Sequence, residues 1–136
     1  MTLYQTTVEV TGGRDGKAKS HDGLLDVGLS LPKELGGKGT ATNPEQLFAA
    51  GYAACFESAL RHVANHEKVK IGDTKVNATV GIGPRADGGF KLAVELVVSV
   101  SGIDPHIAED LVQKAHFVCP YSHATKGNID VSISLA

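Results

Sequence analysis

The sequence lacks most features that would place it in a specialised class of protein. It has only two cysteines in 136 residues, too few for a scaffold held together by disulfides. Its formal charge of -2 gives no electrostatic basis for binding nucleic acid. No apolar run approaches the roughly 20 residues of a membrane span, and residues 1–10 alternate polar and apolar without signal-peptide character. We therefore expect a cytoplasmic protein that binds neither nucleic acid nor membrane.

Motifs for two common functions are also missing. There is no Cys-x-x-Cys sequence, which argues against a general disulfide oxidoreductase. The glycine-rich loop around Lys38 lacks the glycine-lysine-hydroxyl spacing of a phosphate-binding loop. The chain has no internal repeat, and 42 % of its residues are hydrophobic. Its length suits one globular domain, which we expect to cover residues 1–136.

The most distinctive stretch is a predicted helix over residues 44–65. Asn43 is a favourable N-cap, Pro44 suits the first helical position, and Gln46 stands where a capping-box glutamine would stand. The middle of the helix is almost entirely small or apolar and carries Cys55. Because a helix that is apolar on all sides is usually buried, we expect tight packing around it.

The rest of the chain predicts strands and one further helix. Alternating patterns indicate strands over residues 3–11, 17–21, 25–31, 74–84, 90–101 and 128–135. Asp104 and Pro105 begin a second helix, which has one apolar face. Pro120 ends this helix, so that Cys119 lies at its C-terminal end. Strands and helices do not alternate regularly, which predicts an α+β fold with antiparallel sheets around a long central helix.

The two cysteines are the leading candidates for chemistry. Two thiols that can meet form a dithiol, which can reduce a substrate and close as a disulfide. The attacking thiol must be ionised, yet Cys55 lies mid-helix and Cys119 lies at a helix C-terminus, where the helix dipole disfavours an anion. A cation must therefore come from elsewhere. The chain has three arginines, and the residues alone do not choose among Arg14, Arg61 and Arg85.

A zinc site is the alternative interpretation of the same region. His116 and His123 flank Cys119 at spacings of three and four residues, and Cys55 could supply a fourth ligand. Pro120 interrupts the helical register inside this cluster, and the paired-ligand pattern of specific zinc motifs is absent. We favour exposed polar roles for both histidines.

Several motifs together resemble one family. Residues 43–56 (NPEQLFAAGYAACF) and 118–122 (VCPYS) are similar to the two signature segments of the organic hydroperoxide resistance (Ohr) proteins, a branch of the Ohr/OsmC superfamily. Residues 35–39 (LGGKG) and 13–16 (GRDG) match the same branch. The likeness runs essentially from end to end of the chain.

The resemblance implies a function, a fold and a set of site residues. It implies a thiol peroxidase for organic hydroperoxides, including fatty-acid hydroperoxides, without a bound cofactor. Cys55 would be the peroxidatic thiol and Cys119 the resolving thiol; Arg14 would stabilise the Cys55 thiolate, and Glu45 would hold Arg14. The family fold is an intertwined homodimer with active sites at the subunit interface. Dihydrolipoyl groups on partner proteins would reduce the enzyme again.

Two further expectations concern substrate and geometry. The aromatic residues nearest the cysteines could form an apolar wall for the alkyl part of the substrate: Phe48, Tyr52, Phe56 and Tyr121. For most of them, ordinary core packing is the better explanation. Glu45 and Cys55 lie about 15 Å apart along a straight helix. We therefore expect Glu45 to come from the partner subunit, or the helix to bend or to start later.

A protein of another class would use the same residues. A zinc-binding or redox-sensing protein could employ Cys55, Cys119, His116 and His123 without catalytic turnover. Such a sensor would stop after one oxidation, whereas a peroxidase would consume hydroperoxide for as long as a dithiol is present.

Overall fold

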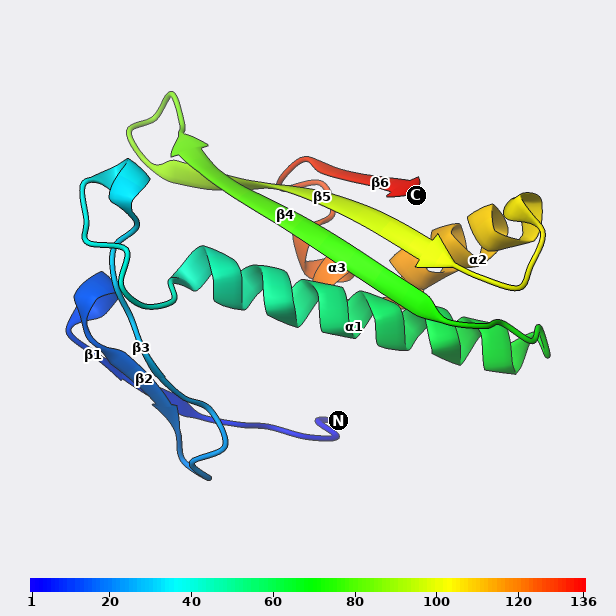
Figure 1. Cartoon of the computed structure of the whole chain (residues 1–136), viewed down its shortest axis with the longest axis horizontal. Coiled ribbons are helices and arrows are strands. Elements are labelled where there is room, and N and C mark those ends of the chain that lie inside the picture. Colours follow the sequence, from blue (N-terminus) through cyan, green and yellow to red (C-terminus); the bar gives the residue numbers. More distant parts are fainter. The chain divides into compact units, whose positions relative to one another are not determined.

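The computed structural model describes all residues, 1–136, and divides into two compact units. The first unit is Met1–Leu47 and the second is Phe48–Ala136. Helix α1 begins in the first unit and continues into the second (Figure 1). We describe each unit separately; the expectation of a single domain over residues 1–136 stays a prediction.

The N-terminal unit is built on a small antiparallel sheet. Its strands are β1 (Val8–Thr11), β2 (Lys17–Ser20) and β3 (Asp26–Gly28), with the order β1-β2-β3. Short 3-10 turns cover Gly13–Asp15 (η1) and Lys33–Leu35 (η2). The turn between β1 and β2 starts at Gly12, whose positive φ of 77° favours glycine. Strand β1 is shorter than predicted because its partner β2 pairs only from Thr11↔Lys17 to Val8↔Ser20.

Helix α1 spans Pro44–His66, close to the predicted bounds. The side-chain oxygen of Asn43 accepts the Gln46 backbone N–H at 2.9 Å, which confirms the predicted cap. The Gln46 side chain instead accepts from the Thr42 hydroxyl at 2.6 Å. Within this chain α1 buries one face, whereas Ala50 and Ala54 are exposed. The expectation of burial on all sides is therefore wrong for a single chain.

The C-terminal unit contains a mixed sheet. Strands β4 (Thr74–Pro84) and β5 (Phe90–Val100) form a long antiparallel hairpin. Strand β6 (Val131–Leu135) pairs with β5 in parallel, from Val94↔Val131 to Val98↔Leu135. This pairing corrects the expectation of purely antiparallel sheets. The physical reason is the long helical connection from β5 to β6, since a parallel return needs a crossover of a dozen or more residues.

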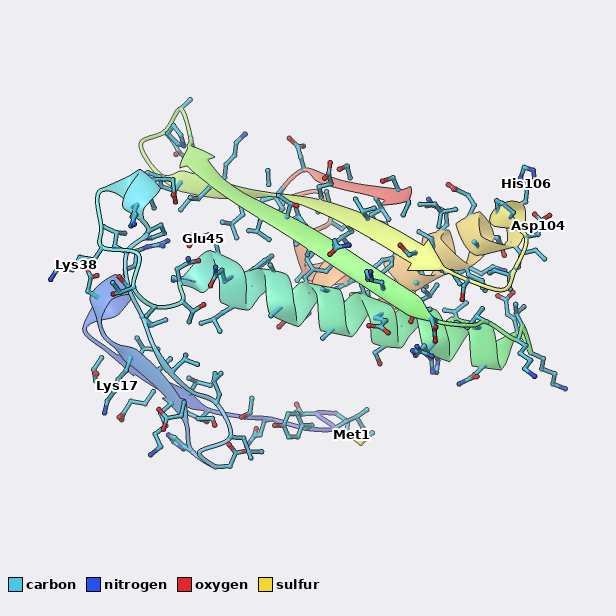
Figure 2. All side chains as sticks on the ribbon, in the orientation of Figure 1. Met1, Lys17, Lys38, Glu45, Asp104 and His106 are labelled. Atoms are coloured by element: carbon cyan, nitrogen blue, oxygen red, sulfur yellow. The ribbon has the colours of Figure 1, made fainter.

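Two helices form that connection. Helix α2 spans Pro105–Val118, and its cap is the predicted one: Asp104 Oδ1 accepts the His106 backbone N–H at 2.8 Å (Figure 2). A short helix α3, Pro120–Thr125, was not predicted. Figure 1 shows the β4–β5 hairpin running along α1. The buried core draws on α1, β5 and α2, with Phe56, Leu60, Leu96, Val98 and Leu111 almost fully enclosed.

The fold class is therefore α+β with a long central helix, as the sequence predicts. None of the helices combines the length and hydrophobicity required to cross a membrane.

Candidate active site

The structure brings the two cysteines together. Cys55 Sγ and Cys119 Sγ lie 3.7 Å apart, and both residues are free thiols. A disulfide has an S–S distance of about 2.05 Å, so only a small movement is needed for the two sulfurs to bond once one of them is oxidised. Cys55 is half-buried, whereas Cys119 is completely buried. A small molecule from solvent therefore has access to Cys55 before Cys119.

The local sequence around Cys119 explains its position. Its backbone N–H donates to Ala115 O at 2.8 Å and ends α2, and its φ and ψ of -63° and 123° are extended. The following residue, Pro120, favours this extended conformation and then begins α3. Cys119 thus forms an elbow between two helices, as the proline predicted. The elbow points its thiol toward Cys55 on α1.

Glycine at position 51 permits the close packing at this elbow. A Cβ added to Gly51 would lie 2.6 Å from the hydroxyl oxygen of Tyr121 and 3.0 Å from its Cζ. Gly51 lies about one helical turn before Cys55. Its missing side chain therefore lets the Tyr121 ring lie against α1 beside the thiol pair.

The surroundings within the structure do not by themselves favour a thiolate at Cys55. Burial raises the pKa of the Cys55 thiol, and the neighbouring Cys119 raises it further. A hydrogen bond from the Tyr121 backbone N–H lowers the same pKa, but the net direction is upward. Because the thiolate is the nucleophile, rapid chemistry at Cys55 requires a cation.

Arg14 and Glu45 form an ion pair within the N-terminal unit. Arg14 Nη1 and Nη2 donate to the two carboxylate oxygens of Glu45 at 2.8 and 2.6 Å. Arg14 lies in η1. Glu45 lies in the first turn of α1 (Figure 2). The hydrogen bonds from Arg14 hold the pKa of Glu45 below its ordinary value, and those to Glu45 raise the pKa of Arg14. Such a bidentate pair fixes the plane of the guanidinium.

The start of α1 tests one of the expected explanations for the separation between Glu45 and Cys55. Helix α1 begins at Pro44 and continues to His66, so Glu45 and Cys55 belong to one helix. A later start of the helix is thereby excluded. The supply of Glu45 to the thiol site by a partner subunit stays a prediction.

The residues of the zinc alternative do not assemble into a site. No group of three or more His, Cys, Asp or Glu side chains could hold a metal ion. His116 Nδ1 is hydrogen-bonded to Ser122 Oγ at 2.8 Å, so it is not the exposed polar residue that we expected. His123 is exposed, as expected.

The four predicted aromatic residues separate into two groups. Tyr52 and Phe56 are completely buried in the core. Phe48 and Tyr121 pack edge-to-face, with ring centroids 6.1 Å apart, and both line a cavity of about 630 Å³. The other apolar lining residues come from the β4–β5 hairpin and from the segment that follows Cys119: Ile82, Phe90, Leu92, Pro120, Ala124 and Ile129. Four lining residues are polar or charged, and one of them, Arg85, is among the three candidate cations: Arg85, Lys91, Thr125 and Asn128. Pro120 and Tyr121, which line the cavity, directly follow Cys119 in the sequence, so the cavity lies next to the elbow that carries this thiol.

One part of the site was missed by the sequence reasoning. Tyr52, His116, Ser122 and Thr125 form a connected set of hydrogen bonds beside the cysteines. The only signal in the sequence was spacing, because Tyr52 precedes Cys55 by three residues and Ser122 follows Cys119 by three.

The chain is similar to known proteins over nearly its whole length. The sequence model of the family described as "OsmC-like protein" matches residues 37–134. An organic hydroperoxide resistance protein of Xanthomonas axonopodis pv. citri is 54% identical, over 98% of this chain and 95% of the relative. The organic hydroperoxide resistance protein OhrB of Bacillus subtilis is 46% identical over 99% of each chain.

The solved structures show the same likeness. The crystal structure of an organic hydroperoxide resistance protein from Legionella pneumophila superimposes with a TM-score of 0.97 at 51% identity, covering 100% of this chain and 99% of the other. The OhrB structure from B. subtilis gives a TM-score of 0.90 at 46% identity, covering 99% and 100%. The chain belongs to the OsmC family, and within that family to the organic hydroperoxide resistance proteins.

Proposed function

We propose that this protein is a cysteine-based peroxidase that reduces organic hydroperoxides, including fatty-acid hydroperoxides, to alcohols. The observation that carries the proposal is the thiol pair: one half-buried sulfur and one buried sulfur, 3.7 Å apart, beside Pro120 and Tyr121, which line a largely apolar cavity. The names of the relatives point to the same substrate class. The cavity suits the alkyl part of such a substrate, with Phe48 and Tyr121 in its wall.

The reaction begins at Cys55. Its thiolate attacks the terminal oxygen of the peroxide, the O–O bond breaks, and the alkoxide leaves as an alcohol after taking up a proton. Cys55 becomes a sulfenic acid. Arg14 stabilises the thiolate and the departing oxygen, because its positive charge offsets negative charge at both stages. Glu45 holds the Arg14 guanidinium in orientation through their two hydrogen bonds.

Cys119 completes the first half of the cycle. Its thiol condenses with the sulfenic acid, releases water and leaves a Cys55–Cys119 disulfide, which protects Cys55 from irreversible oxidation. An external dithiol of the lipoyl type, carried on a partner protein, reopens the bridge by thiol–disulfide exchange. No bound cofactor takes part in these steps.

The active form is a homodimer in this proposal. The N-terminal unit leaves large apolar side chains in solvent: Leu3, Tyr4, Val10 and Leu24 are between 53 % and 89 % exposed. Ala50 and Ala54 on α1 are exposed as well. A second copy that covers these surfaces would bury them, and a symmetric dimer is the commonest way to do so.

Turnover is the direct test of this function. Purified protein with dihydrolipoamide should consume many equivalents of an organic hydroperoxide and form equal amounts of alcohol. Cys55→Ser should abolish the reaction. Consumption of a single equivalent, even with excess dithiol, would instead indicate a redox sensor without turnover.

A further inference from the structure

A buried chain of hydroxyl groups joins three helices next to the cysteines. The Tyr52 hydroxyl lies 2.8 Å from Ser122 Oγ, which lies 2.8 Å from His116 Nδ1. Thr125 Oγ1 lies 3.3 Å from the Tyr52 hydroxyl. Tyr52 and Ser122 are 0 % and 2 % exposed, so water does not compete for these bonds.

These hydrogen-bonded hydroxyl groups connect the two turns that carry the thiols. Tyr52 lies one turn before Cys55 on α1, and Ser122 lies three residues after Cys119 on α3. His116 lies three residues before Cys119 on α2. The bond between Tyr52 and Ser122 therefore crosses from the helix of Cys55 to the elbow of Cys119, and His116 fixes the same serine from the other side of that elbow.

Each group in the chain has a consistent role as donor or acceptor. Burial lowers the pKa of His116, and the nearby charge of Lys126 lowers it further, which favours the neutral ring; in one of its two tautomers Nδ1 accepts. With that tautomer, Ser122 donates to His116 and accepts from Tyr52, while the Thr125 hydroxyl donates to the Ser122 backbone oxygen at 3.1 Å. No buried side-chain nitrogen or oxygen in the structure lacks a partner. Loss of the Ser122 hydroxyl would remove a hydrogen-bond partner from both Tyr52 and His116.

We propose that Tyr52 and Ser122 are positioning residues that hold the Cys119 thiol at Cys55 for disulfide formation. The proposal rests on the function above and concerns its second step. In that step the Cys119 sulfur attacks the sulfenic sulfur of Cys55; the S–S bond forms, the S–O bond breaks, and the hydroxyl leaves as water with the proton of the Cys119 thiol. No step passes through the hydroxyl chain itself.

A competing reaction makes this positioning measurable. A second molecule of hydroperoxide can oxidise the sulfenic acid of Cys55 to a sulfinic acid and leave as an alcohol. Both outcomes start from the same sulfenic acid, so their ratio is independent of how fast that acid is formed. A less well-held Cys119 has a lower effective concentration at Cys55, which shifts the ratio toward sulfinic acid.

The experiment compares variants with and without the crossing bond. Mass spectrometry measures the ratio of sulfinic acid to disulfide at a fixed concentration of hydroperoxide. In Tyr52→Phe and Ser122→Ala this ratio should rise about five- to tenfold, which corresponds to the net free energy of one such hydrogen bond. Ser122→Thr keeps the hydroxyl and should stay near wild type. Val63→Ala is the matched control, because Val63 is buried on α1 two turns beyond Cys55 and lies outside the chain of hydroxyls. It should lower stability without changing the ratio.

A second readout does not depend on hydroperoxide. In thiol–disulfide redox buffers, the reduction potential of the Cys55–Cys119 pair should become more positive in Tyr52→Phe by about 20 to 30 mV, which corresponds to the same fold-change. Unchanged ratio and potential would overturn the positioning proposal, and so would equal shifts in Val63→Ala. Failure of the peroxidase function would appear separately, as a wild-type protein that forms a disulfide in redox buffer but does not react with hydroperoxide.

Discussion

Cys55 and Cys119 have different environments although their sulfurs are only 3.7 Å apart. Cys55 is half-buried, and Cys119 is enclosed in the core. This difference favours attack by Cys55 and resolution by Cys119, which is the order that the family resemblance implies. It also leaves Cys55 dependent on a cation, because burial raises the pKa of its thiol.

The first prediction concerns that cation. Arg14→Gln should slow oxidation of Cys55 by a hydroperoxide at least about tenfold near pH 7, since the thiolate loses its stabilising charge. The pKa of Cys55 is raised, so the rate should recover as the pH is raised through that pKa. Stopped-flow measurement of the rate against pH tests this. Arg61→Gln is the control, because Arg61 pairs with Glu57 on the exposed side of α1, and it should keep the wild-type profile.

A second prediction concerns Glu45 and stability. The pKa of Glu45 is lowered by Arg14, so the pair stabilises the fold above the ordinary pKa of a glutamate and loses this effect as the pH falls through the lowered pKa. Glu45→Gln should therefore reduce the free energy of unfolding by about 1 kcal/mol near pH 7 and by less near pH 3. Urea denaturation at both pH values measures the difference. Glu34→Gln removes an exposed acid from the same unit and serves as the control. An equal loss of unfolding free energy at both pH values in Glu45→Gln would contradict the prediction.

At the scale of elements, α1 brings together more of the site than any other element. It carries Cys55, Glu45 in its first turn, and Gly51, against which Tyr121 packs. Its cap by Asn43 and its start at Pro44 could be predicted from local chemistry alone. The same holds for α2 and for the β4–β5 hairpin, whose apolar alternation is unambiguous.

Other elements could not be predicted from local patterns. The parallel pairing of β6 with β5 depends on where the α2–α3 connection returns the chain, and alternation within one strand does not encode direction. Helix α3 has six residues, too few for a helical period to show. The hydrogen bonds of Tyr52, Ser122 and His116 join residues from three helices, so only the tertiary structure reveals them.

A third prediction concerns the packing of α1 at Gly51. Glycine to alanine in a helix normally stabilises by about 1 kcal/mol. Here the new Cβ would meet the hydroxyl oxygen of Tyr121 at 2.6 Å, so Gly51→Ala should give no stabilisation and should displace the Tyr121 ring. Tyr121→Phe removes the nearest atom and should restore part of the gain. A double-mutant cycle measured by chemical denaturation gives the coupling free energy between the two substitutions. If their effects on the free energy of unfolding are additive, the predicted contact is contradicted.

At the scale of the whole molecule, a single chain exposes an apolar surface on its N-terminal unit. Strand β1 is exposed along its entire length, and Leu24 is 89 % exposed. A monomer would leave these side chains in water, whereas the proposed homodimer would bury them.

A fourth prediction follows from that surface. Wild-type protein should sediment as a dimer, and Val10→Asp combined with Leu24→Asp should shift it toward a monomer, because each aspartate would have to be buried without a partner. Lys75→Asp is the control, since Lys75 is an exposed residue of β4 in the other unit. Analytical ultracentrifugation distinguishes the outcomes. A wild-type monomer, or a double variant that remains fully dimeric, would contradict the assigned surface.

The most direct test of the central claim is a thiol count after a single oxidation. Reduced protein is treated with one equivalent of an organic hydroperoxide in the presence of a chelator, and free thiols and alcohol are measured. We predict that the two thiols fall to none, that one equivalent of alcohol forms, and that Cys55→Ser does not react. Two thiols left intact would contradict the peroxidase account. Protein that unfolds when the chelator is added would instead indicate a structural metal ion.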